Sequence, residues 1–351
     1  MDKARREQFI NRILGHATGA ALSGMIYIGD RVGLFKALWR AGPLTSADLA
    51  ARTGLQERYV REWLSAMAAA EIVEYDPAAE TFCFPEEHAA VLADDDSPSL
   101  LAGLFQNMPA MLSIAPRVAD AFVSGGGVPF SEFGPDMIAG IDRSNRTQYR
   151  YHLVKRWLAA MPQVVQSLRE GAVAADVGCG SGYPSILMAQ AFPNSRFHGF
   201  DLSEQSLARA RTDAQAQGVA DRVQFRCVAA TDIPREPKFD VVTSFDAIHD
   251  MVDPRGVLRA IRAALKDDGT YFMVEPRAGD TLADNLGQTG AMMYATSTLH
   301  CMTVSLAHGG EGIGTAIGPG KVRELADEAG FTRVRQLPIE HPAQAFYELR
   351  P

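Results

Sequence analysis

The sequence predicts an α/β fold in which a parallel, doubly wound sheet follows a mainly helical first half. In the first half, apolar residues recur at helical spacing, whereas after Gly171 short apolar runs alternate with amphipathic stretches. A glycine-rich turn follows the first of those apolar runs, which is where parallel sheets bind ligands. The 351 residues, 47% of them hydrophobic, suffice for one large or two modest domains.

The charge and the cysteines narrow the class of protein. The chain has 34 Lys and Arg against 42 Asp and Glu, a formal charge of −8, so its surface repels nucleic acid and anionic membranes. The four cysteines are far apart and form no CxxC motif, which excludes a disulfide framework and a zinc ribbon and fits a reducing compartment. We therefore expect a cytoplasmic protein with no nucleic acid, membrane or metal partner.

The uncharged stretch Ile13–Gly29 resembles a targeting signal, but it is short for a membrane span and rich in glycine. We favour a tightly packed helix at a homodimer contact. The next stretch, Leu44–Tyr75, predicts a helix-turn-helix with an N-cap at Thr45, and Tyr59, Trp63, Leu64 and Met67 supply its apolar stripe.

A predicted hairpin, Ile72–Tyr75 with Thr81–Phe84, completes a winged helix. Residues 44–80 carry three basic and seven acidic residues, and a helix that enters the major groove needs a basic surface. We therefore expect this domain to serve in dimerisation rather than in DNA binding. Residues 1–95 are predicted to form this domain, 96–170 a helical linker or lid region that includes a helical run at Ser144–Glu170, and 171–351 the sheet domain, with an insertion at 276–318.

The sheet domain is predicted from strands separated by helices. The strands expected are Ala172–Val177, Arg196–Leu202, Arg222–Val228, Phe239–Phe245 and Thr270–Glu275, with Thr332–Ile339 and Ala343–Arg350 as a closing antiparallel pair. The intervening helices begin at Pro184, after the cap Ser203, and at Asp253-Pro254.

The chemistry begins at the turn Asp176-Val177-Gly178-Cys179-Gly180-Ser181-Gly182. Glycine lets the backbone approach a ligand closely, and the helix start supplies N–H groups. The third glycine is one residue early for the dinucleotide pattern GxGxxG, and the strand-end Asp176 suits a cationic amine rather than a phosphate. Asp201 ends the second strand, where a carboxylate holds ribose hydroxyls; the alternative role is a helix cap.

The order of these motifs resembles class I S-adenosylmethionine-dependent methyltransferases. The blocks that carry the resemblance are D-V-G-C-G-S-G, F-D-L-S, F-D-V-V-T-S-F-D and D-G-T-Y-F-M-V-E-P, between Gly171 and Pro351. The first half is similar to the winged-helix dimerisation domain of plant-type small-molecule O-methyltransferases and their bacterial relatives. The resemblance implies a Rossmann-like sheet of seven strands with the last one antiparallel, and S-adenosylmethionine as cofactor with S-adenosylhomocysteine as product.

The resemblance also implies which residues bind that cofactor. The glycines would cradle the methionine moiety, Asp176 would receive its ammonium and Asp201 the ribose. The family's adenine-contacting Asp is replaced here by Ala229, so Asp232 is the substitute. The full set expected at the cofactor is Asp176, Gly178, Cys179, Gly180, Gly182, Asp201, Leu202, Ala230, Thr231, Asp232 and Phe245.

The step His249-Asp250 matches the His-Asp step of plant-type O-methyltransferases, whose histidine is the general base, although the Trp that follows there is Met251 here. Imidazole titrates near neutrality, so it suits removal of a hydroxyl proton during methyl transfer. The alternative for His249 is a loop residue that binds backbone groups. Asp250 and Glu275 are the further catalytic candidates; Glu275 orients a base or the substrate, and the alternative is that it only ends its strand.

The substrate pocket is predicted from variable segments, with Phe130, Tyr149, Tyr151, Tyr294 and His300 as its residues. The acceptor is expected to be a small-molecule hydroxyl. Three alternatives stay open: methylation of nitrogen, carbon, sulfur or a carboxylate; a regulator whose winged helix binds DNA and whose second domain senses S-adenosylmethionine; and a nicotinamide-dependent dehydrogenase, disfavoured by the glycine spacing.

Overall fold

The structure, a computed structural model, describes residues 1–351 and divides into two compact units. Unit 1 comprises Met1–Leu112 and Gly134–Thr147, and unit 2 comprises Ser113–Phe133 and Gln148–Pro351. The chain therefore passes between the units three times.

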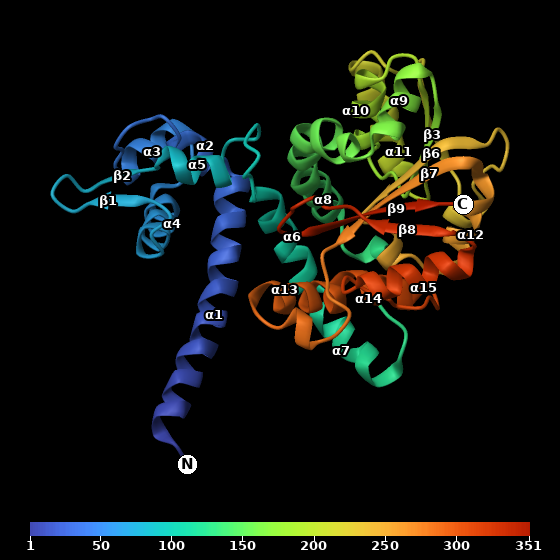
Figure 1. The fold of residues 1–351 in the computed structure, drawn as a ribbon. Coiled ribbons are helices and arrows are strands. Elements are labelled where there is room, and N and C mark those ends of the chain that lie inside the picture. The colour runs from blue at the N-terminus through green and yellow to red at the C-terminus, as the bar shows by residue number, and fades with distance from the viewer. The chain divides into compact units, whose positions relative to one another are not determined.

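Unit 1 is helical apart from one hairpin (Figure 1). Its elements are α1 (Lys3–Arg31), α2 (Leu34–Leu38), α3 (Ser46–Thr53), α4 (Glu57–Ala69), β1 (Glu74–Asp76), β2 (Thr81–Cys83), α5 (Glu86–Leu92), α6 (Ala102–Ser113) and α8 (Pro135–Gln148). The winged helix is confirmed: Thr45 caps α3 by accepting from the Asp48 backbone, and β1 pairs with β2.

One detail of the predicted stripe is wrong, because Tyr59 is 80% exposed. Val60 takes its place beside Trp63, Leu64 and Met67, since the buried face of α4 starts one residue later. The Trp63 indole donates to the Met25 carbonyl of α1 at 2.9 Å. This bond and the burial of Trp63 fix the end of α1 on the winged helix.

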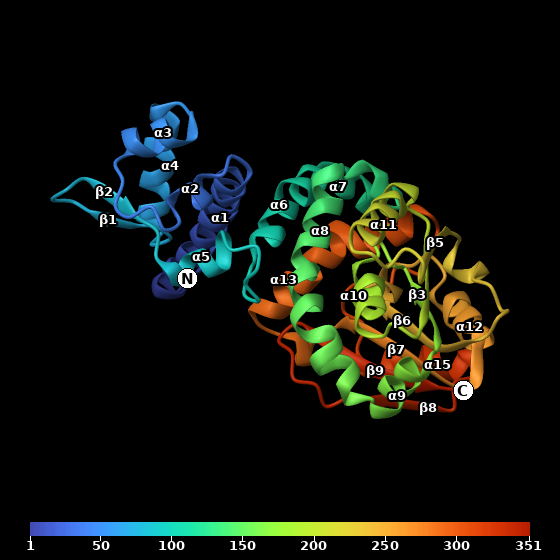
Figure 2. The same cartoon turned by 90° about the horizontal axis from the view of Figure 1, so that it is seen from above.

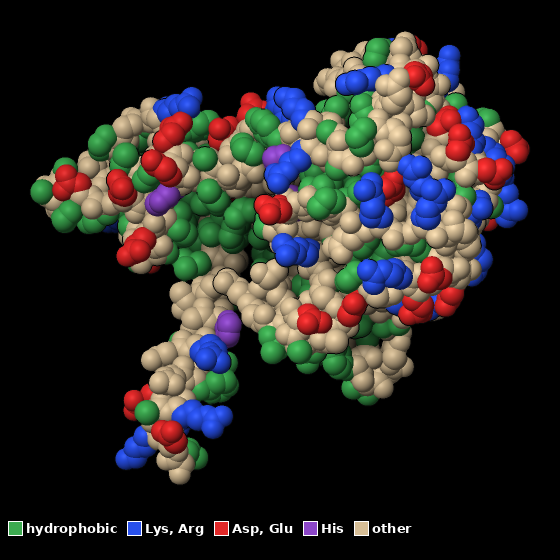
Figure 3. All heavy atoms as spheres, viewed as in Figure 1, with side chains coloured by type: hydrophobic (Ala, Val, Ile, Leu, Met, Phe, Trp, Pro, Cys, Tyr) green, Lys and Arg blue, Asp and Glu red, His purple; other side chains and the backbone are tan.

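The first two-thirds of α1 pack against nothing within the chain. Every residue from Met1 to Ala21 is exposed, and only the end of the helix is buried, at Ile26 and Gly29. Figure 1 shows this helix running well beyond α2, α3 and α4, and Figure 3 shows charged and hydrophobic side chains along it. The tight packing expected for Ile13–Gly29 is therefore limited to its last turns.

Unit 2 is built on a seven-stranded sheet of order β5-β4-β3-β6-β7-β9-β8. Its strands are β3 (Val173–Val177), β4 (Arg196–Asp201), β5 (Val223–Cys227), β6 (Phe239–Phe245), β7 (Leu265–Pro276), β8 (Arg333–Gln336) and β9 (Gln344–Arg350). The first five run parallel, and β9 is antiparallel to both β7 and β8. The predicted Rossmann-like sheet with an antiparallel last strand is confirmed.

Helices cover both faces of this sheet (Figure 2). One face packs on α9 (Pro162–Glu170), α10 (Tyr183–Ala191) and α11 (Glu204–Ala216), and the other on α12 (Pro254–Ala264) and α15 (Pro319–Ala329). Strand residues alternate between the two hydrophobic cores, as Val241 and Val242 do. Because both faces are buried, the strands read as continuous apolar runs in the sequence.

The segments outside the sheet are less regular than the sequence predicts. The helical run expected at Ser144–Glu170 is broken into α8, the π-helix η2 (Tyr149–Trp157) and α9, which starts at Pro162 because proline has no N–H to donate. The segment after β7 contains α13 (Gln288–Thr296), the π-helix η7 (Ser297–Cys301) and α14 (Met302–Ala307). Another helix, α7 (Ala115–Ser124), precedes η1 (Phe130–Glu132). None of the helices combines the length and the hydropathy that crossing a membrane requires.

Candidate active site

The glycine loop lies between β3 and α10, at the carboxyl end of the parallel strands. Gly178, Gly180 and Gly182 all have φ between +50° and +72°, which favours glycine. A Cβ at Gly182 would lie 2.4 Å from the Phe225 ring, so the fold itself requires glycine there. A Cβ at Gly180 would meet no atom within 4 Å, so open space lies over the middle of the loop.

Two carboxylates flank this loop. Asp176 is 2% exposed and accepts from the hydroxyls of Ser185 and Thr243 at 3.0 and 2.9 Å. Burial, reinforced by the charge of Asp201, raises the pKa of Asp176 to about 7. Asp201 accepts from the backbone N–H of Gly180 at 2.9 Å and of Ser203 at 2.8 Å, so it holds the loop and also the turn into α11. Each carboxylate keeps lone pairs for a ligand.

The other residues expected at the cofactor lie around the same end of the sheet. Cys179 and Phe245 are buried, the latter against the rings of Tyr149 and Trp157 at 5.4 and 6.5 Å. Leu202, at the end of β4, is 71% exposed. The single turn η4 (Ala230–Asp232) follows β5 and presents Thr231 and Asp232 to solvent, whereas Ala230 is half-buried.

His249 and Glu275 form a buried dyad. His249 lies in the short helix η5 (Ile248–Asp250) directly after β6, and Glu275 lies near the end of the neighbouring strand β7. The His249 Nδ1–H donates to Glu275 Oε2 at 2.6 Å, and the Ile248 backbone N–H donates to Oε1 at 2.9 Å. Both side chains are almost fully buried, so Glu275 fixes the tautomer and the ring plane of His249.

Two aspartates stand on either side of His249. Burial raises the pKa of Asp250 to about 7, against the opposing effect of His249. Burial and the charge of Glu275 raise the pKa of Asp246 to about 7 as well. Asp246 adopts φ +50° and accepts from the Gln344 amide at 2.8 Å, while its other oxygen has no partner.

The predicted pocket residues are only partly brought together. The rings of Phe130 and His300 lie edge to face at 5.6 Å, and Tyr149 packs on Phe245. The Tyr294 hydroxyl, near the end of α13, instead accepts from the amide of Asn285, which precedes α13, at 3.2 Å, and Tyr151 is 38% exposed.

The sequence reasoning left several residues of this region out of the site. The buried Cys301 accepts from the Thr315 hydroxyl at 3.3 Å, and its sulfur lies 3.4 Å from Nδ1 of the adjacent His300. Buried polar atoms without partners occur on Trp157, Asp246 and Gln344, near the ends of β6 and β9. The position of Asp246 directly after an expected strand could have placed it in the site. Nothing in the sequence around Thr315 and Gln344 predicts their place here, since only the fold brings them to this end of the sheet.

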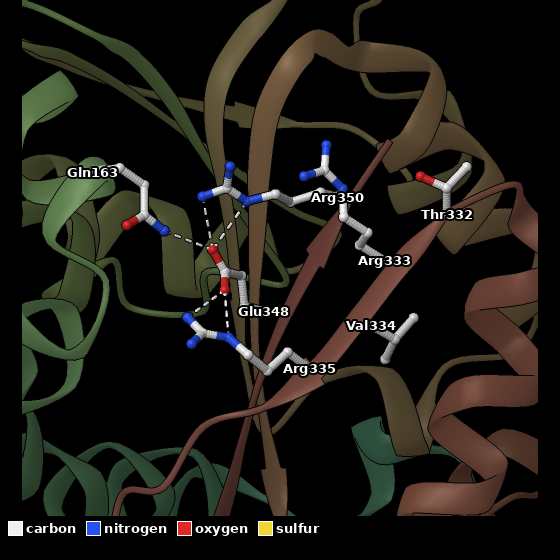
Figure 4. Close-up of a pocket in the computed structure, with 7 residues that line it drawn as sticks. All are labelled: Gln163, Thr332, Arg333, Val334, Arg335, Glu348 and Arg350. Atoms are coloured by element: carbon white, nitrogen blue, oxygen red, sulfur yellow. Dashed lines mark hydrogen bonds and ion pairs between the residues drawn. The ribbon is translucent and has the colours of Figure 1, made fainter.

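A hollow of about 740 Å³ lies at the opposite end of the sheet, and Figure 4 shows its lining. Its centre is Glu348, which is 6% exposed and accepts from Arg335, Arg350 and Gln163. The register Tyr271↔Leu349 places these residues beside the start of the parallel part of β7, away from the glycine loop. No group of three or more His, Cys, Asp or Glu side chains is arranged to hold a metal ion.

Comparison with known proteins agrees with this architecture. Residues 20–94 match the Rv2258c-like winged HTH domain, and residues 168–330 match a methyltransferase domain. The human N-acetylserotonin methyltransferase structure in complex with SAM aligns with a TM-score of 0.72 at 18% identity, over 100% of this chain and 98% of that one. At that identity the likeness concerns the fold.

Two curated relatives are more similar in sequence over shorter spans. The ubiquinone biosynthesis O-methyltransferase of Neisseria meningitidis is 38% identical over 102 residues, 28% of this chain and 41% of that protein. The 27-O-demethylrifamycin SV methyltransferase of Amycolatopsis mediterranei is 32% identical over 139 residues, 38% of this chain and 51% of that protein. The chain thus spans about half or less of these relatives. It combines an Rv2258c-like winged helix-turn-helix domain with a domain of the methyltransferase family.

Proposed function

We propose that this chain transfers a methyl group from S-adenosylmethionine to a hydroxyl oxygen of a small molecule, with His249 as general base. The observation that carries the proposal is the buried His249–Glu275 dyad, which stands at the carboxyl end of β6 and β7 next to the glycine loop. A base so placed removes a proton from a group held in front of the loop.

The residues present fit this methyl donor. The sulfonium of S-adenosylmethionine supplies an electrophilic methyl group. The open space over Gly180 admits the methionine part of the donor. The carboxylate of Asp176 then receives the cationic ammonium of that part. Asp201 holds the loop with one lone pair of each oxygen and offers the others to the ribose hydroxyls.

The dyad supports an acceptor that must lose a proton. A neutral hydroxyl is a weak nucleophile, and a positioned base contributes roughly 10²–10⁴-fold. Glu275 stabilises the imidazolium that forms, because it already accepts from Nδ1. Nitrogen, carbon, sulfur and carboxylate acceptors are the alternatives, and a thiolate or carboxylate acceptor needs no base at all.

The comparisons support a small-molecule acceptor. The names of both relatives describe methyltransferases of small molecules, and that of the N. meningitidis protein specifies an oxygen. The regulator alternative is disfavoured, because the winged helix carries an excess of acidic residues.

The exposed half of α1 supports a homodimer. Phe9, Ile10, Ile13 and Leu14 form one apolar stripe at helical spacing, and each is 46–59% exposed. The same apolar stripe on a second copy of this helix would cover it. We expect analytical ultracentrifugation to give a dimer that Ile13→Glu and Leu14→Glu together convert to monomer, whereas Arg12→Glu on the same helix leaves it intact. A monomeric unaltered chain contradicts this proposal.

Calorimetry tests the cofactor first. S-adenosylmethionine and S-adenosylhomocysteine should both bind the full chain, and Asp201→Asn should weaken both. A panel of simple phenols and catechols, analysed by mass spectrometry for a gain of CH₂, then tests the acceptor. No heat with either nucleoside overturns the whole proposal, whereas binding followed by methylation of amines or thiols alone overturns only the oxygen.

A further inference from the structure

The hollow of Figure 4 carries more positive charge than its own contacts neutralise. Three arginines line it, Arg333, Arg335 and Arg350, against the single carboxylate of Glu348, so its lining has a net charge of +2. The chain as a whole has a formal charge of −8, which makes this positive lining a local feature. The volume of about 740 Å³ falls within the roughly 300–1,000 Å³ of small-molecule sites.

The register of β8 and β9 brings these four side chains to one face of the sheet. Arg333 lies directly opposite Arg350, and Arg335 lies directly opposite Glu348. Residues two apart on a strand point to the same face, so both pairs line the hollow. Opposite charges across two strands stabilise a sheet and like charges destabilise it, so the Arg333–Arg350 pair lacks the anion that its neighbour has.

Both oxygens of Glu348 are already occupied. Oε1 accepts from Nε and Nη2 of Arg350 at 3.0 and 2.9 Å and from Gln163 of α9 at 2.7 Å. Oε2 accepts from Nε and Nη2 of Arg335 at 2.9 and 2.6 Å. These bonds hold one edge of each guanidinium group, and Nη1 on the other edge has no partner among the lining residues. Each of these two arginines is therefore fixed in place and still able to donate to a ligand.

Arg333 is the arginine of the hollow that no carboxylate pairs. Its guanidinium makes no hydrogen bond or ion pair, and Figure 4 shows it on the same side of Glu348 as the guanidinium of Arg350. A guanidinium group has five N–H donors in a planar fork that matches the oxygens of a phosphate or carboxylate. The unpaired donors of Arg333 and Arg350 thus face the same part of the hollow.

Arginines on an edge strand also serve to keep that strand from pairing with other chains. Since β8 is the edge of the sheet, this role would account for Arg333 and Arg335. It does not account for Arg350, which lies on β9 between β7 and β8. It also does not account for the buried Glu348, which holds Arg350 in place. The set as a whole fits a preformed anion site better than protection of an edge.

We propose that the hollow binds a small molecule by its phosphate group, which lies between the guanidinium groups of Arg333 and Arg350. The phosphate of an organic ester carries a charge of about −1.5 to −2 at pH 7, which matches the net charge of the lining. Its terminal oxygens accept paired N–H bonds from guanidinium edges, and such charge-assisted pairs are among the strongest hydrogen bonds in proteins. Arg335 supplies further N–H donors on the other side of Glu348.

This site is separate from the one proposed for the methyl donor. Gln344 and Arg350 are the two ends of β9, a strand of seven residues, so they lie about 20 Å apart at roughly 3.3 Å per residue. Gln344 donates to Asp246 beside the candidate base, at the far end from the hollow. The phosphate compound is therefore a second ligand of the chain, and its binding does not rest on the proposed function.

Calorimetry on the full chain, in a dilute buffer free of phosphate and sulfate, tests the site with phenyl phosphate and inorganic phosphate as probes. We expect both to bind at one site per chain. Arg333→Gln should weaken both about tenfold, since it removes charge-assisted hydrogen bonds to the anion. Arg259→Gln, at an exposed arginine of α12 on the other face of the sheet, is the matched control and should leave the Kd unchanged. No heat with either probe, or a Kd that Arg333→Gln leaves within about twofold, overturns the proposal.

A second test separates a phosphate site from a merely basic surface. Arg333→Lys keeps the charge but loses the paired N–H edge, so the Kd for phenyl phosphate should rise about threefold. A Kd that this variant leaves unchanged contradicts the paired geometry. Arg333 is exposed, and equal thermal unfolding temperatures check that its variants leave the fold intact. Hexaglutamate represents an acidic protein segment, and if it binds more tightly than phenyl phosphate, the small-molecule proposal is wrong.

Discussion

The two ends of the sheet hold buried carboxylates in opposite circumstances. At the hollow of Figure 4, Glu348 accepts from Arg335, Arg350 and Gln163, and although burial opposes it these arginines lower its pKa. At the glycine-loop end, Asp176 accepts from Ser185 and Thr243, and Asp246 accepts from Gln344, none of which is basic. Burial raises the pKa of Asp176, Asp246 and Asp250 to about 7. A carboxylate whose oxygens are fully paired with basic donors stabilises the fold, whereas a carboxylate without a basic partner is available to a cationic ligand.

The largest effect expected at the glycine-loop end is on catalysis. His249→Ala should lower kcat for a phenol acceptor by about 10³-fold, because it removes the proposed general base. S-adenosylmethionine affinity by calorimetry should stay within about threefold. His308→Ala is the control, at an exposed position. A kcat within tenfold of the unaltered chain would show that the acceptor needs no base.

The largest effect expected at the other end is on stability. Glu348→Ala should lower the free energy of unfolding in urea by about 2 kcal/mol and leave kcat unchanged. Breaking a fully buried pair costs about 3–5 kcal/mol, and the exposed Arg335 recovers part of this by turning to water. Glu340→Ala, at an exposed side chain, should change little. A loss of activity without a loss of stability would assign Glu348 to a site.

Replacing Asp250 should raise the free energy of unfolding, whereas replacing Glu348 should lower it. Its pKa of about 7 in the fold lies above the unfolded value, so the stability of the chain falls as pH rises from about 4 to 7 and then levels off. Asp250→Asn should therefore be more stable than the unaltered chain by about 1.5 kcal/mol at pH 8, with the gap closing near pH 4. Asp267→Asn, at an exposed carboxylate, is the control. A gap that is independent of pH contradicts the raised pKa.

The smallest effect concerns cofactor affinity. If the ammonium of S-adenosylmethionine binds at Asp176, it favours the ionised carboxylate, so affinity should rise about fivefold between pH 5.5 and 7.5. The Kd by calorimetry measures it, and Asp176→Asn should bind more weakly with no such dependence. An affinity that is flat with pH for the unaltered chain would place the ammonium elsewhere.

The parts that the sequence predicts well are those governed by local periodicity. The strand Phe239–Phe245 is found at its expected bounds, because a buried parallel strand is apolar throughout. The pairing of His249 with Glu275 was also within reach, since adjacent parallel strands end at the same edge. The contact of Cys301 with Thr315 was not, because it depends on the path of a π-helical segment that has no periodic signal.

The ion pairs of Asp30 and Asp95 with Arg143 limit where the chain can be cut into separately folding fragments. Arg143 of α8 reaches both carboxylates at 2.6–3.0 Å, and Asp136 of the same helix meets Tyr27 and Arg31. A single truncation near residue 113 removes this helix from the amino-terminal fragment, so Tyr27, Asp30, Arg31 and Asp95 lose their partners on it. A chimera that exchanges unit 1 between homologous chains therefore has to exchange residues 134–147 together with residues 1–112.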